Sequence, residues 1–308
     1  MIQKRYLPWL GALGVALFLP LIAGDSPYLM KVLIIMVIFI IYTHSWNLLT
    51  YSGQASLGHA AFFGIGGYAS ALLASKSGLS PFITIFAGAI FAAVAGAIVG
   101  AICVRLREWF LAMVTFGFSI IIGTLFLNQF TGIFGGVDGM PAQRFFSATL
   151  EHRYLYEYYF MLLLAIATTL LVHRIMHSRL GVAFAAIREN ELEAKVLGVD
   201  TARYKLIAFL ISTYIAGLAG ALQTHSFAYI TPEIFSVHNS FWPVIYAIAG
   251  GLGTLEGPIL GTVFITLIWE GLKNLGLSFE RFVIIGALLV VMVVLKPGGL
   301  SSVFDRWR

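Results

Sequence analysis

The sequence is divided into apolar runs about as long as a lipid bilayer is thick. A spanning helix needs about 20 consecutive, mostly apolar residues. Lipid offers the backbone no hydrogen bonds, so a chain that spans it this often must satisfy its backbone within helices. The candidate spans are 7–23, 29–50, 57–75, 80–103, 109–128, 155–177, 205–228, a broken region at 240–273, and 281–296. Only 11% of the 308 residues are Asp, Glu, Lys or Arg, against about 25% in soluble domains. We therefore predict an all-α polytopic membrane protein.

The apolar region 240–273 is interrupted by the glycine-rich segment 250–258 (GGLGTLEGP). Glycine and proline disfavour a helix interior, so this segment predicts a break in the helix. Two short helices meeting there would give about ten crossings, whereas one kinked helix would give about nine. We expect nine or ten transmembrane or half-membrane helices, some broken at glycines, in a single transmembrane domain over 1–308.

Cations flank both ends of the apolar region: Lys4, Arg5, Lys296, Arg306 and Arg308. Lysine and arginine gather in the cytoplasmic loops of membrane proteins, so both termini are expected inside. The first run, 7–23, resembles a signal peptide in its basic start, but it ends on a poor cleavage site and is long enough to span. We therefore expect it to be retained as the first helix.

Two loops stand out between the spans. The loop at about 178–204 is the most charged part of the chain: ten of the 32 residues from Arg174 to Lys205 are charged, six of them cations. A charge at the bilayer centre costs about 2.5–3.5 kcal/mol, so this loop cannot lie in the membrane, and its excess of cations places it in the cytoplasm. The loop at about 129–154 is then periplasmic.

The charged loop carries the signals of a short helix. Asn190 can cap a helix that begins at Glu191, and Glu193 completes a capping box. Glu191 and Lys195 have the spacing of an i,i+4 ion pair. Gly198 stands where a helix stop is expected. We therefore predict a capped helix at 191–197.

This helix would carry a short apolar stripe, Leu192 and Val196 with Leu197 beside it, and a second helix is expected before it at 182–189. The stripe is too short to build a core of its own. It suggests either a surface for a partner protein or a helix that lies on the membrane. The residues alone leave these two alternatives open.

Several segments in this part of the chain match one family. They are SRLG (178–181), AIRENE (186–191), Glu193-Ala194 with Gly198, Lys205-Leu206 with Ala208-Phe209, and AGLAGAL (216–222). Together they resemble the LivM-type permeases of branched-chain amino-acid ABC importers, and the Glu-Ala-x-x-x-Gly core resembles the EAA loop of importer permeases. Three further segments extend the resemblance over most of the chain: YSGQASLGHAAFFGIGGYA (51–69), GGLGTLEGP (250–258) with Gly261, and PGGL (297–300).

In that family the charged loop forms a coupling helix that docks into a groove of an ATPase. Carried over to this chain, the resemblance assigns docking to Arg188, Glu189, Glu191, Glu193, Ala194 and Gly198. The sequence departs from the family pattern at Val182, where an arginine is common, and at Lys195, which replaces the second alanine of the EAA motif.

The resemblance also implies the partners: a second homologous permease, two cytoplasmic ATPase subunits, and a periplasmic substrate-binding protein, all at a bacterial-type inner membrane. ATP and Mg²⁺ would be held by the ATPase subunits, with no cofactor in this chain. The default cargo is leucine, isoleucine and valine, and related systems import urea, amides or other amino acids. The binding protein is expected to touch the loop at 129–154. The basic charge is explained by cytoplasmic loops and does not predict nucleic-acid binding.

The glycine-rich segments are not phosphate-binding loops, because neither ends in Gly-Lys-Ser/Thr. We therefore expect no ATP hydrolysis, and no enzyme activity, from this chain.

Broken membrane helices leave free amide groups that transporters use to bind anionic substrate groups. We therefore name a candidate translocation path: Gly53, Gly58, His59, Gly251, Gly253 and Glu256. The alternative is that the glycines only let helices cross closely and that the two ionisable groups sit at wet helix ends.

Three other functions are alternatives to this one. A secondary transporter driven by protons or sodium would need more buried ionisable groups along its path, and it would leave the charged loop without a role. A membrane-embedded enzyme is not indicated, because the sequence has no metal-ligand spacing and no nucleophile with a placed base. A channel is not excluded by composition.

Overall fold

The computed structural model describes residues 11, 14–22, 24, 26–103, 106, 108–277 and 279–302. Lys4, Arg5, Arg306 and Arg308 lie outside these residues, as do parts of the first predicted span, of which 14–22 are helical. Within the described residues, five helices are long and apolar enough to cross a membrane. They are α2 (Pro27–Tyr51), α4 (Pro81–Cys103), α5 (Glu108–Asn128), α7 (Arg153–Met176) and α10 (Thr201–Phe227). The predicted all-α polytopic fold is confirmed.

Shorter helices complete the bundle: α3 (His59–Ser77), α11 (Val237–Gly250), α12 (Gly257–Asn274) and α13 (Glu280–Leu295). Two more, α8 (Arg179–Glu189) and α9 (Glu191–Val196), form the charged loop. The loop after α5 contains α6 (Thr131–Phe134), η1 (Gly136–Asp138) and β1 (Met140–Pro141). Strand β1 pairs antiparallel with β2 (Tyr229–Ile230), which precedes η2 (Pro232–Phe235). This small pairing ties the loop predicted at 129–154 to the end of α10.

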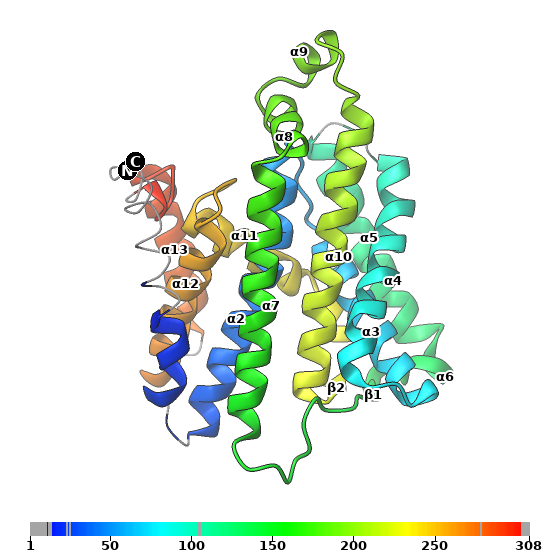
Figure 1. Ribbon diagram of the computed structural model, residues 1–308, viewed down its shortest axis with the longest axis vertical. Coiled ribbons are helices and arrows are strands. Elements are labelled where there is room, and N and C mark those ends of the chain that lie inside the picture. Colours follow the sequence, from blue (N-terminus) through cyan, green and yellow to red (C-terminus); the bar gives the residue numbers. More distant parts are fainter. Residues whose placement is uncertain are drawn as a thin grey trace.

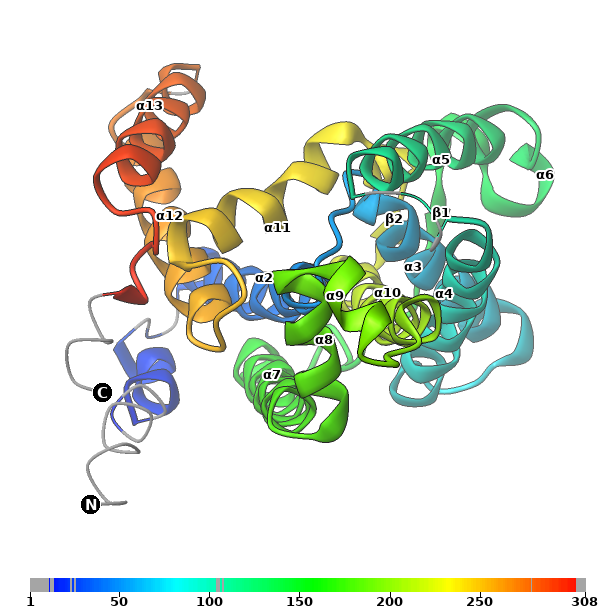
Figure 2. The same cartoon turned by 90° about the horizontal axis from the view of Figure 1, so that it is seen from above.

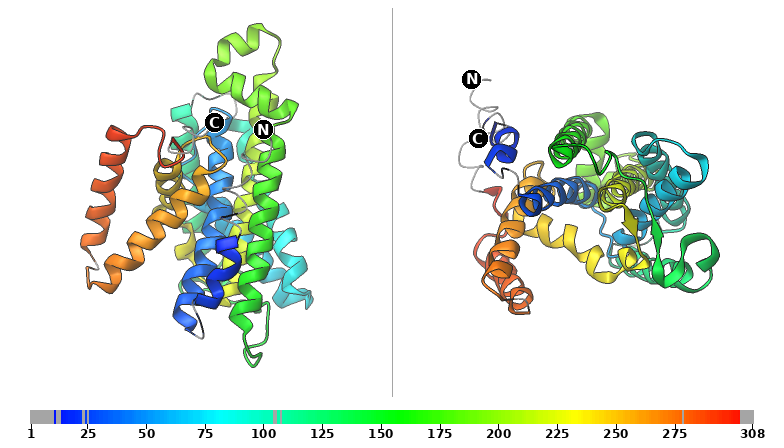
Figure 3. Two further views of the ribbon diagram at one scale, coloured as in Figure 1. Left: turned by 60° about the vertical axis from the view of Figure 1, so that its left-hand side comes forward. Right: turned by 90° about the horizontal axis from the view of Figure 1, so that it is seen from below.

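Helices α2 and α10 form the centre of the bundle. Viewed along the bundle, α3, α4 and α5 lie on one side of this pair, α12 and α13 lie on the other, and α11 runs between the two groups (Figure 2). Helix α13 forms the outer edge, and α12 slants between it and the rest (Figure 3). Burial is greater in the centre than at the side: 78% of the most apolar 18-residue stretch of α2 is buried, but only 22% of the corresponding stretch of α5. The central helices are therefore the core, and α5 presents a face to lipid or to a partner.

The two predicted loops lie at opposite ends of the molecule. Helices α8 and α9 project beyond one end of the bundle, and α6, β1 and β2 lie at the other (Figure 1). The charged loop and the loop at 129–154 therefore lie at opposite ends of the long apolar helices. We refer below to the side that carries α8 and α9 as the α8–α9 end.

The broken region at 240–273 forms two helices, α11 and α12, which is the first of the two predicted alternatives. The segment that follows α13 returns to this break: the amides of Leu300 and Ser301 donate to the carbonyls of Ala249 and Gly250, at 3.0 and 2.8 Å. Gly299 has a φ of +65° and packs against the backbone of Gly251. The segment PGGL therefore closes the C-terminal end of α11, whose last carbonyls would otherwise lack partners.

Close backbone contact holds the inner helices together. A β-carbon at Gly220 of α10 would lie 1.8 Å from the carbonyl oxygen of Phe63 in α3, and one at Gly88 of α4 would lie 2.4 Å from that of Gly66. Small residues permit this approach, which strengthens dispersion contacts where lipid removes the hydrophobic effect between helices. Replacing these glycines would push α3, α4 and α10 apart.

The approach of Gly58 to α5 gives a testable case. A β-carbon there would lie 1.7 Å from the carbonyl oxygen of Thr115, so Gly58→Ala should destabilise the protein by about 1–3 kcal/mol, as overpacking does elsewhere. The measurement is the midpoint of thermal unfolding in detergent. Gly117→Ala on α5 is the control, because among the described residues no atom of another segment lies within 4 Å of that β-carbon. Equal midpoints for the two variants would contradict the close contact.

Candidate functional site

The charged loop begins with a tight turn between α7 and α8. The Ser178 hydroxyl oxygen accepts from the amide of Leu180 at 3.2 Å and caps α8. A β-carbon at Gly181 would lie 2.2 Å from the carbonyl oxygen of Met176. The serine and the glycine of the SRLG segment are therefore explained by the geometry of the turn, which sets the direction in which α8 leaves the membrane domain.

Helix α9 is fixed at both ends, as predicted. The side-chain oxygen of Asn190 accepts from the amides of Leu192 and Glu193, at 3.1 and 3.3 Å. The carboxylate of Glu193 completes the cap by accepting from the side-chain amide of Asn190, at 2.6 Å, and not from the backbone N–H of Asn190. At the other end, Gly198 has a φ of +88°, and the amides of Gly198 and Val199 donate to the carbonyls of Lys195 and Ala194. This is the Schellman arrangement, which requires glycine at the left-handed position.

The two faces of α9 differ sharply. Leu192, Val196 and Leu197 are 76, 88 and 83% exposed. Glu193 and Gly198 are also exposed, whereas Ala194 is buried on the side that packs against α8 and α10. The small side chain of Ala194 lets α9 lie close to the body of the loop, so its contribution to any docking surface is indirect.

The predicted ion pair between Glu191 and Lys195 is wrong. Glu191 pairs with Lys205 of α10, with 2.5 Å between the carboxylate and the ammonium nitrogen. The side chain of Lys205 is only 3% exposed, and a buried cation needs a partner, whereas Lys195 is exposed. The carbonyl of Lys205 also accepts from the side-chain amide of Gln54, at 3.0 Å. The start of α9 is thereby connected through α10 to the break after α2.

Both predicted helix breaks meet at Arg188. A β-carbon at Gly53 would lie 3.0 Å from the Cα of Arg188, and one at Gly253 would lie 2.1 Å from Nη1 of the same arginine. Asn47 of α2 binds the second break directly: its Oδ1 accepts from the amide of Gly253 at 2.8 Å, and its Nδ2 donates to the carbonyl of Thr254 at 2.6 Å. The structure thus gathers Gly53, Arg188 and Gly253 at one place near the α8–α9 end.

The other predicted path residues lie apart from Arg188. His59 is fully buried, with Nε2 2.9 Å from the hydroxyl of Ser45 and 3.3 Å from that of Ser212. It joins α2, α3 and α10, so the alternative that placed it at a wet helix end does not hold. Gly251, with a φ of +127°, lies against Ser301. Glu256 precedes α12 and is partly buried.

Comparison with known proteins gives the decisive observation. Residues 28–294 match the family model described as the branched-chain amino acid transport system permease component. The chain belongs to this family. One relative is the high-affinity branched-chain amino acid transport system permease protein LivM of Escherichia coli (strain K12), which is 29% identical to this chain over 273 residues. The aligned region covers 81% of this chain and 64% of that protein. The chain thus spans just under two thirds of that relative's length.

Two further relatives support the assignment. The probable branched-chain amino acid transport permease protein LivM of Methanocaldococcus jannaschii is 26% identical over 269 residues, covering 78% of this chain and 77% of that protein. The permease protein LivH of Escherichia coli (strain K12) is 30% identical over 127 residues, 41% of each chain. No solved protein structure was found to match this permease.

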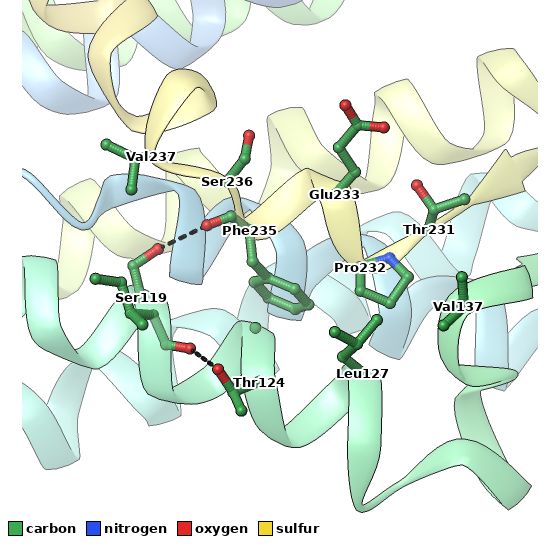
Figure 4. Close-up of a pocket in the computed structure, with 12 residues that line it drawn as sticks. Ser119, Thr124, Leu127, Val137, Thr231, Pro232, Glu233, Phe235, Ser236 and Val237 are labelled. Carbon is green, nitrogen blue, oxygen red and sulfur yellow. Dashed lines mark hydrogen bonds between the residues drawn. The ribbon is translucent and has the colours of Figure 1, made fainter.

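The permease also has a cavity of about 480 Å³ between α5 and the junction of η2 with α11 (Figure 4). Its walls are mostly apolar, and none of the six predicted path residues lines it. The Ser119 hydroxyl donates to the carbonyl of Phe235 at 3.1 Å, and that of Thr124 to Ile120 at 2.9 Å, so both are engaged. The carboxylate of Glu233 points away from α5 in Figure 4. The cavity offers apolar surface beside Val137, in the loop predicted at 129–154.

Sequence reasoning missed Asn47, Gln54 and Lys205 as parts of this site. Each is polar and buried, and each lies in or beside a predicted span. A polar group that interrupts an apolar run was the available signal, because it needs a hydrogen-bond partner inside the membrane domain. Among the described residues, no group of three or more His, Cys, Asp and Glu side chains is placed to hold a metal ion.

Asn47 provides the test of how firmly the second break is held. Asn47→Ala should leave the buried amide of Gly253 without a partner and destabilise the permease by about 1–3 kcal/mol. A lowered midpoint of thermal unfolding in detergent would show this. Asn128→Ala serves as the control, because that exposed amide donates to the carbonyl of Thr124 within its own helix. An Asn47 variant as stable as the control would show that the turn does not depend on this side chain.

Proposed function

We propose that this permease is one transmembrane subunit of an ATP-driven importer, and that separate ATPase subunits dock on α9. The exposed apolar stripe of Leu192, Val196 and Leu197 supports this most directly. A helix of only six residues is too short to be stable alone in water. Here it is capped at both ends and fixed by the Glu191–Lys205 pair, while its apolar side chains remain uncovered. A rigid, exposed apolar patch of this kind is typical of a surface that binds a protein partner.

The position of α9 favours a protein partner over the membrane surface. Helix α9 lies at the tip of the projection, beyond α8 and beside the start of α10 (Figure 1). A helix that binds lipid would lie along the ends of the spans, with its apolar face toward the acyl chains. The apolar stripe of α9 is displaced from that level, into the solvent where a soluble ATPase would be found.

The rest of the assembly follows from the same proposal. ATP and Mg²⁺ would be bound by two cytoplasmic ATPase subunits and not by this chain. A second, homologous permease would cover part of α5, whose side chains Trp109, Met113 and Ile121 are exposed and apolar. A periplasmic binding protein would deliver the cargo at the end that carries β1 and β2, and the protein would lie in a bacterial-type inner membrane.

The proposed cargo is leucine, isoleucine and valine, which would cross by alternating access driven by ATP hydrolysis. The names of the LivM relatives support branched-chain amino acids. The mostly apolar cavity between α5 and η2 would suit the hydrocarbon side chains of such a cargo near the side from which it arrives.

The function is tested by purifying the permease with its partners from its own membranes and reconstituting it in liposomes. Uptake of radiolabelled leucine, isoleucine or valine should require ATP in the compartment that the α8–α9 end faces. It should also require the binding protein and the co-purified ATPase subunits. Uptake that ran on a proton or sodium gradient without these subunits would overturn the proposal. Uptake that needed ATP but favoured urea or another amino acid would overturn only the cargo.

The docking role of α9 gives a specific prediction. Leu192→Asp or Val196→Asp should weaken retention of the ATPase subunits about 10- to 100-fold, because an apolar side chain buried in an interface contributes about 1.5–3 kcal/mol. Quantitative mass spectrometry of the purified complex would measure this. Leu275→Asp is the control, because Leu275 is equally exposed but lies in the turn between α12 and α13. Equal losses from both sites would contradict docking on α9.

A further inference from the structure

Arg188 occupies an unusual position at the end of α8. Its backbone packs on Gly53, and its guanidinium fills the space where a side chain of Gly253 would lie. Both glycines have positive φ angles, +74° and +69°, so other residues would be strained there as well as excluded by Arg188. Each break thus presents bare backbone to the same arginine, three residues before α9 begins.

The charge of Arg188 suits this place. Helix α2 ends at Tyr51 and α11 at Gly250, so the C-terminal ends of both helices lie close to the arginine, which is itself in the last turn of α8. The C-terminal end of a helix carries partial negative charge, and a nearby cation stabilises it. Arginine at this position therefore contacts the segments that follow α2 and α11 and brings a favourable charge to their ends.

The two breaks are also joined to each other. Asn47 of α2 holds the turn at Gly253 and Thr254 by two hydrogen bonds, and Ser301 donates to the carbonyl of Gly250. The ends of α2 and α11 are thus bonded to each other as well as in contact with Arg188. The Glu191–Lys205 pair connects α9 separately to α10, so α9 stays attached to the membrane domain when Arg188 is removed.

We propose that Arg188 is a positioning residue that transmits the movement of the α8–α9 loop to the C-terminal ends of α2 and α11. This inference rests on the proposed function, because the movement would come from the docked ATPases. Arg188 acts through the helix breaks and not by contact with cargo or ATP. The glycines at 53 and 253 form the socket that receives it, which gives both breaks a role in coupling apart from lining a path.

The test is the coupling ratio, the number of cargo molecules taken up for each ATP hydrolysed, in the complete reconstituted complex. In complexes of Arg188→Ala that contain the ATPase subunits, ATP should still be hydrolysed, while the coupling ratio falls at least tenfold. Arg188→Lys keeps the cation and most of the stem, and should recover part of the ratio. Loss of the ATPase subunits would make Arg188 a docking residue only, and an unchanged ratio in both variants would overturn the inference.

Glycine variants test the socket independently, including the case in which Arg188→Ala fails to assemble. Gly253→Ala should lower the coupling ratio, because its β-carbon would displace the guanidinium. Gly78→Ala is the matched control: its φ is +62°, but within the described part of the chain no atom beyond its immediate neighbours in sequence lies within 4 Å of the β-carbon. Gly253→Ala should add little to Arg188→Ala in the double variant, since both disturb one contact. A ratio equal to that of Gly78→Ala would overturn the inference.

These outcomes separate the inference from the proposed function. If the unmodified complex takes up cargo without ATP or without ATPase subunits, the proposed function fails. If the unmodified complex couples ATP hydrolysis to uptake and the Arg188 and Gly253 variants do so equally well, only the role of Arg188 fails.

Discussion

The requirement that every backbone polar group find a partner inside lipid governs this structure. It is met by helices throughout the spans, and it is met differently where the helices break. At the second break, Asn47 binds the amide of Gly253 and the carbonyl of Thr254, while the chain after α13 donates to the end of α11. The breaks are therefore ordered parts of the fold, held by specific partners from distant segments.

Glycine has two separate physical roles in this chain. At Gly58, Gly88 and Gly220 it permits backbones to touch, because a β-carbon would collide with a neighbouring carbonyl or side chain. At Gly53, Gly198 and Gly253 it permits a positive φ that ends or redirects a helix. The second group lies around the α8–α9 loop and the two breaks. At these three positions the backbone has a conformation in which any other residue would be strained.

Local patterns in the sequence predicted much of this arrangement. Run lengths located the spanning helices to within a few residues, and Asn190 and Gly198 marked the two ends of α9, because helix propensity and capping depend on neighbours in sequence. The partner of Glu191 was predicted wrongly for the opposite reason. Lys195 is close in sequence, but Lys205 is the cation that is buried and needs a carboxylate, and burial is not a local property.

The sequence by itself determined the membrane class, the order of the helices, the capped helix with its apolar stripe, and the resemblance to a family. Only the tertiary structure decided that the two glycine breaks, separated by about 200 residues, meet at Arg188, and that the cavity beside α5 lies away from both. The physical reason is that helices form from local hydrogen bonds, while contacts between them depend on how whole helix faces pack. A glycine in the sequence shows only that a side chain is absent at that position. Which neighbouring group occupies the space depends on the fold.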